Sequence, residues 1–297
     1  MAQFAFRILN VFAPSTFDGN PLCVFEDARG MTDQHMQLLT RQFNLSETAF
    51  VFPPLPDEQA VGVTARVRVF TPGHEMAFAG HPALGCAHVV RAVHGTGPAL
   101  TLRFNAGDVP LSVSADGDPD TWSFVPPLAV APSCWSPALA PAVLATMLGL
   151  ATEDLASDPM WVSTGNDHLL VPLRDAAAVA RATFDPARVA HWPLSSLGRR
   201  SVYVFALSAD EGSRLRVDAR YLFIRDGAVV EDPGTGSACA NLGAWLSLVG
   251  KRSNVAVQVT QGEQMGRLCR LTLDLDEHAG IRVGGHVIEI GRGQVEI

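Results

Sequence analysis

Three side chains in this sequence have the chemistry of proton transfer: Glu47, His81 and Asp232. Glu47 opens an apolar segment, 47–52, and a carboxylate among hydrophobic neighbours loses solvation and takes up a proton more readily. His81 stands in the first turn of an expected helix, where the positive end of the helix dipole favours a neutral imidazole. Asp232 precedes a glycine turn. All three are candidates for acid–base catalysis.

Each of these residues also has a plainer interpretation. Glu47 could be an exposed strand end or could cap its neighbours, and His81 could be a buried or capping histidine. Asp232 could start a turn through its side chain or serve as a helix N-cap. The local pattern leaves these alternatives open.

Two glycine turns could bind an anion. The first spans 78–82 and precedes an apolar run to Val93, and the second spans 232–237 and precedes an apolar run to Val249. A helix start presents unpaired N–H groups and a partial positive charge, so it suits a carboxylate. We therefore expect a small carboxylate-bearing ligand, bound by Gly80, Gly236 and Ser237. Ser237 could equally be an ordinary hydroxyl at a helix start.

Composition bounds the class of protein. The chain has 297 residues, of which 47% are hydrophobic and 18% charged, so it can build a full core. The net charge of −8 and the absence of basic runs argue against nucleic acid or an anionic membrane as partner. No apolar stretch approaches the roughly 18 residues of a membrane helix, and the first residues do not resemble a signal peptide. A cytoplasmic location is expected.

Cofactor chemistry is not indicated. The five cysteines form no C-x-x-C pair and no zinc spacing, and Cys86 and Cys239 lie within apolar helices, where cysteine acts as a small hydrophobe. The sequence has no phosphate loop, no G-x-G-x-x-G after a strand, no G-x-S-x-G elbow and no H-E-x-x-H. We expect no metal and no cofactor.

The elements that position these residues fall into two similar halves. Each half has many expected strands and one helix that is apolar on nearly every side, and such a helix must be covered all round. We expect an α+β fold of two pseudo-symmetric lobes, each a β-barrel wrapped around a central α-helix, with the helix starts facing the cleft between lobes. Among local elements we expect a helix at 32–43, a strand at 61–70 and a hairpin turn at Gly284-Gly285.

Several motifs resemble one family in the same order along the chain. They are 19–24 (GNPLCV), 44–50 (NLSETAF), 70–72 (FTP), 78–82 (FAGHP), 231–238 (EDPGTGSA) and 261–267 (QGEQMGR). On these motifs the chain resembles the PhzF-like phenazine-biosynthesis family, whose fold is similar to that of diaminopimelate epimerase. One departure is Gly234, where alanine is commoner in the family.

The resemblance implies a fold, an assembly and a reaction. The last strand should return to the first lobe, which gives lobes of 1–118 plus 284–297 and of 119–283, and the protein should be a homodimer. The best-characterised member isomerises 2,3-dihydro-3-hydroxyanthranilate, and there a glutamate removes a ring proton and returns it to another carbon. The matching residue is Glu47, with the site shaped by Ser46, Gly80, His81, Asp232, Gly236 and Ser237.

The resemblance also separates the possible reactions. Related epimerases carry a cysteine beside each glycine turn, whereas this chain has Ala79 and Thr235 at those places. The preferred hypothesis is a cofactor-independent isomerase that moves a proton on a small, possibly cyclic carboxylate through one glutamate. The alternatives are a small-metabolite binding or regulatory protein on the same scaffold, and an epimerase or racemase with bases other than cysteine.

Overall fold

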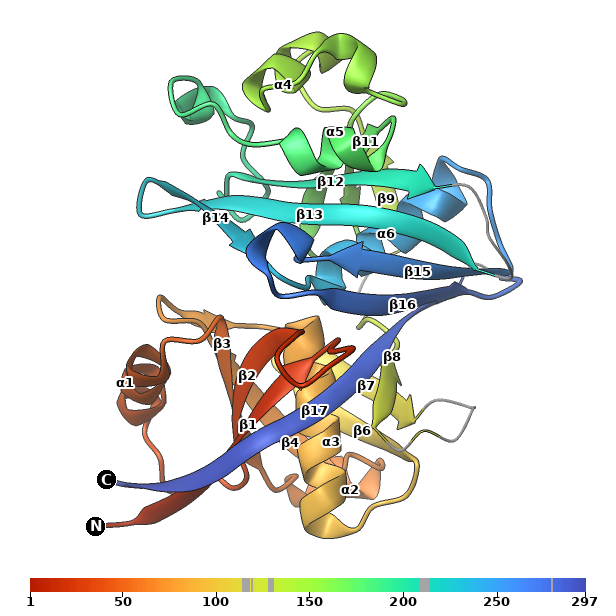
Figure 1. Ribbon diagram of the computed structural model, residues 1–297. Coiled ribbons are helices and arrows are strands. Elements are labelled where there is room, and N and C mark those ends of the chain that lie inside the picture. The colour runs from red at the N-terminus through yellow and green to blue at the C-terminus, as the bar shows by residue number, and fades with distance from the viewer. Residues whose placement is uncertain (114–117, 119, 128–130, 209–213, 279) are drawn as a thin grey trace. The chain divides into compact units, whose positions relative to one another are not determined.

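The computed structural model describes every residue except 114–117, 119, 128–130, 209–213 and 279, and it divides into two compact units (Figure 1). The first unit comprises 1–127 and 283–297, and the second comprises 128–282. Strand β8 (Thr121–Phe124) pairs with β7 and β17 of the first unit. The chain therefore leaves the first unit after β8, a few residues beyond the boundary at 118 that the sequence suggests.

Eight of the described strands close the first unit into a barrel. They pair in the order β17, β1, β2, β3, β4, β6, β7 and β8, and β8 returns to β17. Besides β8, their bounds are Gln3–Val11 (β1), Asn20–Phe25 (β2), Glu47–Phe52 (β3), Ala65–Phe70 (β4), Ala99–Phe104 (β6), Gly107–Val113 (β7) and Ile281–Glu296 (β17). The short β5 (Glu75–Met76) pairs with β4, and α1 (Asp33–Phe43) and α2 (Pro56–Ala60) complete the unit.

Helix α3 (Gly80–His94) fills this barrel. Its buried positions occupy nearly all sides, as expected of a helix that a sheet surrounds. The packing is close: a Cβ built on Gly85 would lie 2.4 Å from Cδ2 of Leu22 and 3.2 Å from Cδ1 of Leu9. The helix ends at Gly95, whose φ of 63° is the left-handed cap that glycine adopts without strain.

The second unit wraps its strands around α6 (Gly236–Leu248) in the same manner. Its pairing order is β9, β10, β11, β12, β13, β15 and β16, with β14 added to β13. The bounds are Ser133–Trp135 (β9), Met160–Ser163 (β10), Asp167–Leu173 (β11), Ser201–Ser208 (β12), Leu215–Arg225 (β13), Ala228–Asp232 (β14), Val255–Gln261 (β15) and Cys269–Leu275 (β16). Helices α4 (Pro141–Met147) and α5 (Ala176–Arg181) pack with the strands in a core of their own. Short 3₁₀ helices span Thr152–Asp154, Val189–His191 and Glu263–Met265.

The two units repeat one sequence of strand pairings. In the first, β1–β2 is antiparallel, β2–β3 parallel, β3–β4 antiparallel, β4–β6 parallel across α3, and β6–β7 antiparallel. In the second, β10–β11, β11–β12, β12–β13, β13–β15 and β15–β16 follow the same alternation across α6. The predicted fold of two pseudo-symmetric barrels, each around a central helix, is confirmed.

Some predictions of local elements are confirmed and others are wrong. Thr32 caps α1 and accepts from the backbone N–H of His35, as its position predicted. The expected strand 61–70 begins only at Ala65, because Gly62 has a φ of 90° and belongs to a turn. The hairpin at Gly284-Gly285 is wrong, since β17 runs straight through and these residues pair with Ser123 and Trp122 of β8. Among the described residues, no helix is both long and apolar enough to cross a membrane.

Candidate active site

The first unit brings Glu47 and His81 together. The parallel pairing of β2 with β3 sets Leu22 opposite Glu47, and His81 is the second residue of α3. Nε2 of His81 lies 3.5 Å from Oε2 of Glu47, with side-chain exposures of 5% and 16%. Glu47 is not the exposed strand end that its plainer interpretation allowed, whereas the burial of His81 agrees with the plainer interpretation of a buried histidine. An imidazole and a carboxylate thus meet in a largely dry environment.

Asn20, which the sequence analysis passed over as a site residue, lies against His81. It is fully buried at the start of β2, and its Nδ2 is 3.4 Å from Nδ1 of His81. The preceding Gly19 has a φ of 83°, and a Cβ there would lie 2.7 Å from the carbonyl oxygen of Val11. The motif at 19–21 is visible in the sequence, but the sequence alone does not show that the side-chain amide of Asn20 points inward.

Burial keeps His81 neutral. Desolvation lowers the pKa of His81 to about 3, against a smaller opposing effect of a hydrogen bond to the backbone of Pro21. Burial thus favours the neutral imidazole that the sequence analysis expects, and desolvation is the largest cause of the lowered pKa. A neutral imidazole offers one N–H donor and one acceptor nitrogen, so it can hold a carboxylate or exchange a proton with it.

The other predicted residues of this unit lie close by in the chain. Ser46 directly precedes Glu47 and is half-buried, and Gly80 is buried as the first residue of α3. The N-cap of α3 is Ala79, in extended backbone conformation, and no side chain caps the helix. The start of α3 therefore keeps the character of an anion-binding helix terminus.

In the second unit, the chain around Asp232 forms a compact polar turn. Asp232 ends β14, and the hydroxyl of Thr235 donates to its Oδ2 at 2.5 Å. Thr235, and not Asp232, is the N-cap residue of α6, so the N-cap interpretation of Asp232 is wrong. Gly236 is buried as the first residue of α6, and Ser237 is half-buried after it.

A second polar network lies deeper along α6, and the sequence analysis missed it. Asn241 is fully buried; its Oδ1 accepts from Thr164, and its Nδ2 lies 2.7 Å from the carbonyl oxygen of Val162 and 2.8 Å from Nδ1 of His168. Burial lowers the pKa of His168 to about 4. The network ties the turn between β10 and β11 to α6. A lone asparagine in an apolar helix was the available signal.

The thiols do not belong to this chemistry. Cys86 and Cys239 are fully buried, and desolvation raises the pKa of both. A buried thiol of raised pKa supplies little thiolate, so neither residue is an effective base. Their predicted role as small hydrophobes fits this placement.

Within the part of the chain that the structure describes, one group of side chains has metal-ligand geometry, and it includes none of the predicted site residues. Ligand atoms of Asp118, Asp120 and His286 lie within 4.8 Å of one another. The carboxylate of Asp118 accepts from the backbone N–H of Asp120 at 3.1 Å and from the hydroxyl of Thr121 at 2.7 Å. Asp120 also lies 3.5 Å from His88. Hydrogen bonds within the protein thus explain this cluster.

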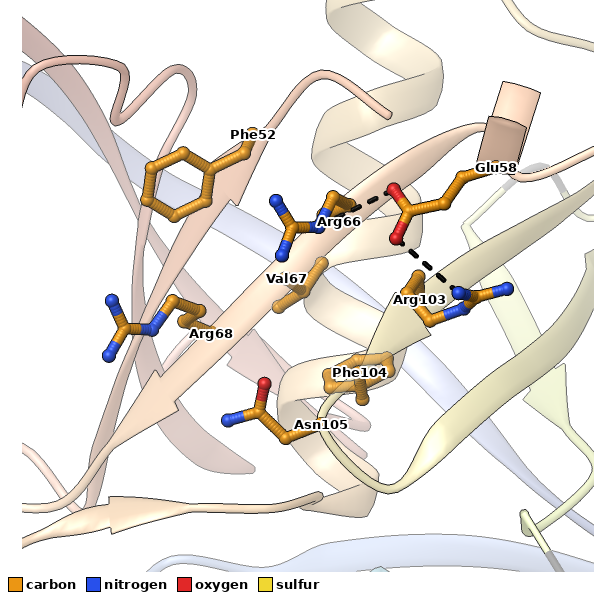
Figure 2. A pocket seen from close by; sticks show the side chains of 8 residues that line it. All are labelled: Phe52, Glu58, Arg66, Val67, Arg68, Arg103, Phe104 and Asn105. Carbon is orange, nitrogen blue, oxygen red and sulfur yellow. Dashed lines mark hydrogen bonds and ion pairs between the residues drawn. The ribbon is translucent and has the colours of Figure 1, made fainter. Parts of the chain in front are cut away.

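None of the predicted site residues lines a cavity of about 260 Å³ in the first unit, whose lining side chains are shown in Figure 2. Glu58 contacts Arg66 at 3.4 Å and Arg103 at 3.3 Å across it. The full lining consists of Phe52, Glu58, Arg66, Val67, Arg68, Arg103, Phe104 and Asn105. The arginines that line the cavity are paired with acidic side chains, so its lining is a network of ion pairs on the outer face of β4 and β6.

Two barrels around central helices, with polar clusters at both helix starts, define an α+β protein of the epimerase-like fold class. The family model described as "Phenazine biosynthesis-like protein" matches residues 9–292, and the chain belongs to this family.

Two relatives and one solved structure extend this result. An uncharacterised isomerase of Pasteurella multocida is 36% identical over 99% of this chain and 95% of its own length. The trans-2,3-dihydro-3-hydroxyanthranilate isomerase of Pseudomonas aeruginosa is 31% identical over 93% of this chain and 91% of its own. A PhzF-family phenazine biosynthesis protein of Bacillus anthracis has the same fold, with a TM-score of 0.83 over 100% of both chains at 22% identity. The chain is an isomerase.

Proposed function

We propose that this isomerase moves a proton between two carbons of a small carboxylate-bearing, possibly cyclic metabolite, with Glu47 as the acid–base group. The contact between Glu47 and His81, at 3.5 Å and largely shielded from solvent, carries the proposal. The P. aeruginosa relative, named for its action on trans-2,3-dihydro-3-hydroxyanthranilate, supports a cyclic amino-carboxylate as the substrate class.

The chemistry requires a base that also returns the proton. A carboxylate that takes a proton from carbon in a dry site keeps it, because no bulk water competes for it, and can deliver it to a second carbon. His81 enters as a neutral partner, since burial lowers its pKa to about 3. It can orient the carboxylate of Glu47 without neutralising its charge. We assign His81 this orienting role.

Charge that develops on the substrate also needs stabilisation. Helix starts supply fixed N–H dipoles for this purpose. We propose Gly80 with Ser46, and Gly236 with Ser237, as substrate-binding residues, and Asp232 as a polar contact to the substrate. A two-thiol mechanism lacks its bases, because the N-cap residues of α3 and α6 are Ala79 and Thr235.

Deuterium exchange tests the role of Glu47. Incubation of trans-2,3-dihydro-3-hydroxyanthranilate in D₂O, followed by mass spectrometry and ¹H NMR of substrate and product, reports proton removal even where isomerisation is slow. We expect Glu47→Gln to lose at least about 10³-fold in exchange rate, because the amide cannot accept the proton.

The matched control is Glu153→Gln, which makes the same chemical change at an exposed glutamate of the second unit. It should leave exchange unchanged. Equal exchange in the wild type and Glu47→Gln would remove Glu47 from the mechanism. Exchange by neither protein would reject this substrate, and a panel of other cyclic and acyclic unsaturated carboxylates then follows.

A further inference from the structure

The turn that leads into α6 contains an ordered chain of hydrogen bonds that ends on Asp232. Thr235 is the N-cap residue of α6, yet its side chain does not cap the helix. A threonine at this place usually accepts from a backbone N–H two or three residues on. Here the hydroxyl instead donates to Oδ2 of Asp232 at 2.5 Å. The hydroxyl of Thr235 therefore bonds to the carboxylate of Asp232 instead of accepting from a backbone N–H of the helix.

Gln261, the last residue of β15, fixes the direction of this chain. Its Nε2 donates to the carbonyl oxygen of Asp232 at 2.8 Å and to Oγ1 of Thr235 at 3.0 Å, while its Oε1 accepts from the N–H of Thr235 at 3.3 Å. A reversed amide would set its oxygen against the carbonyl oxygen of Asp232 and its NH₂ group against the N–H of Thr235, so the orientation is unique. Because Oγ1 of Thr235 already accepts from Gln261, its single hydrogen is directed to Asp232.

Two members of the chain are shielded from water, and Asp232 is half-buried. Gln261 is 1% exposed and Thr235 is 9% exposed. The following Gly262 has a φ of 79°, and a Cβ there would lie 2.7 Å from the carbonyl oxygen of Pro233. The end of β15 thus packs directly on the turn. Burial of this kind strengthens each hydrogen bond and penalises any unpaired group.

We propose that Thr235 and Gln261 are positioning residues that hold Asp232 as an ionised hydrogen-bond acceptor of fixed orientation. A hydroxyl that donates to a carboxylate stabilises it over the carboxylic acid. Asp232 is therefore held as a carboxylate that accepts from a donor on the substrate, and it does not act as a general acid. The relevance to catalysis rests on the proposed function, whereas the hydrogen-bond chain does not.

The titratable neighbours of Asp232 on the sheet do not mask the effect of Thr235 and Gln261 on its carboxylate. Tyr221 of β13 is its register partner, and burial raises the pKa of Tyr221 to about 12, so the phenol stays neutral. Arg199 and Asp167 act on Tyr221 with opposite charges. The adjacent Glu231 is paired with Arg220 at 2.7 Å.

A titration of Asp232 that needs no substrate tests the inference. ¹³C NMR of carboxyl-labelled protein, with the Asp232 resonance assigned through Asp232→Asn, gives its titration in the wild type, Thr235→Val and Thr235→Ser. Loss of one charge-assisted hydrogen bond in Thr235→Val should move the pKa of Asp232 upward by about one unit. Thr235→Ser keeps the hydroxyl and should titrate as the wild type.

A further variant guards against a folding defect. Gln261→Met keeps the side-chain length and removes both donors, so the freed hydroxyl of Thr235 should produce a smaller upward shift. If Asp232 titrates alike in the wild type and in either Thr235→Val or Gln261→Met, the inference is wrong. A shift in Thr235→Ser equal to that in Thr235→Val would assign the effect to packing and would also overturn it. Since the exchange assay of Glu47→Gln is a separate experiment, failure of the proposed function is recognised independently.

Discussion

At the scale of single residues, the first unit places a neutral histidine against a carboxylate, and the neutrality follows from burial. An imidazolium 3.5 Å from Glu47 would form an ion pair and reduce the basicity of the carboxylate. With the pKa of His81 lowered to about 3, the contact at 3.5 Å is one between a neutral ring and an ionisable carboxyl group. This arrangement suits a base that must accept a proton and release it again.

The protonation of His81 yields a prediction for stability. The unfolded chain takes up a proton at this residue below pH 6.5, while the folded chain does not until about pH 3. The contribution of His81 is therefore constant above pH 6.5 and turns destabilising as the pH falls from 6.5 toward 3. Between pH 6.5 and 5 the loss is on the order of 2 kcal/mol.

Urea unfolding of the wild type and His81→Gln at pH 7 and pH 5 measures this loss. The wild type should lose more stability than the variant over this interval, since glutamine does not titrate. His278→Gln is the control, because the side chain of His278 is 87% exposed and its removal should leave the pH slope unchanged. Parallel pH dependences in the wild type and His81→Gln would mean that the buried ring is protonated in the folded state.

At the scale of elements, the turn between β15 and β16 is built on two glycines of different importance. Gly262 and Gly266 have φ values of 79° and 64°, so both are strained by any side chain. A Cβ on Gly262 would also lie 2.3 Å from the carbonyl oxygen of Arg267, whereas one on Gly266 would meet nothing within 4 Å. A comparison of alanine substitutions at the two positions therefore separates the cost of backbone strain from that of a steric clash.

We therefore expect Gly266→Ala to cost about 1 kcal/mol in the free energy of unfolding and Gly262→Ala about 3 kcal/mol or more. The excess arises because the clash involves backbone atoms that cannot rotate away. Urea midpoints of the two variants give the comparison. Equal losses would show that the turn relaxes freely and that β15 does not brace the chain at Asp232.

The elements also show what the sequence could predict. Helix starts, the left-handed cap at Gly95 and the strand at 47–52 follow from local patterns, and the structure places them as expected. The predicted hairpin turn at Gly284-Gly285 is wrong because a hairpin forms only when the two flanking segments pair with each other. Here these segments pair with β8 and β1.

The candidate site was predicted only in part, for a related reason. Glu47, His81 and Asp232 were identified by residue type and motif. Asn20, Gln261 and Asn241 were not assigned to a site, because a buried amide has no periodic pattern and gains its meaning only from the groups that it meets in the fold. Contacts of high sequence separation decide such roles.

At the scale of the whole molecule, the two units repeat one topology but differ in how the chain builds them. The second unit is continuous from 128 to 282, whereas the first needs 283–297 to close its barrel between β1 and β8. The last residues of the chain are thus structural members of the first unit. Closure removes both sheet edges, and an open barrel would expose them.

Removal of 287–297 should consequently destabilise the first unit and leave the second folded. Trp122 is the only tryptophan of the first unit, and Trp135, Trp161, Trp192 and Trp245 belong to the second. With 5-fluorotryptophan, ¹⁹F NMR of the truncated chain should show the Trp122 resonance at its unfolded position and keep the dispersion of the other four. Truncation after 295, which leaves most of the β1–β17 pairing, is the control and should retain the native Trp122 resonance. Simultaneous collapse of all five resonances on removal of 287–297 would show that the second unit cannot hold its fold without the closed barrel of the first.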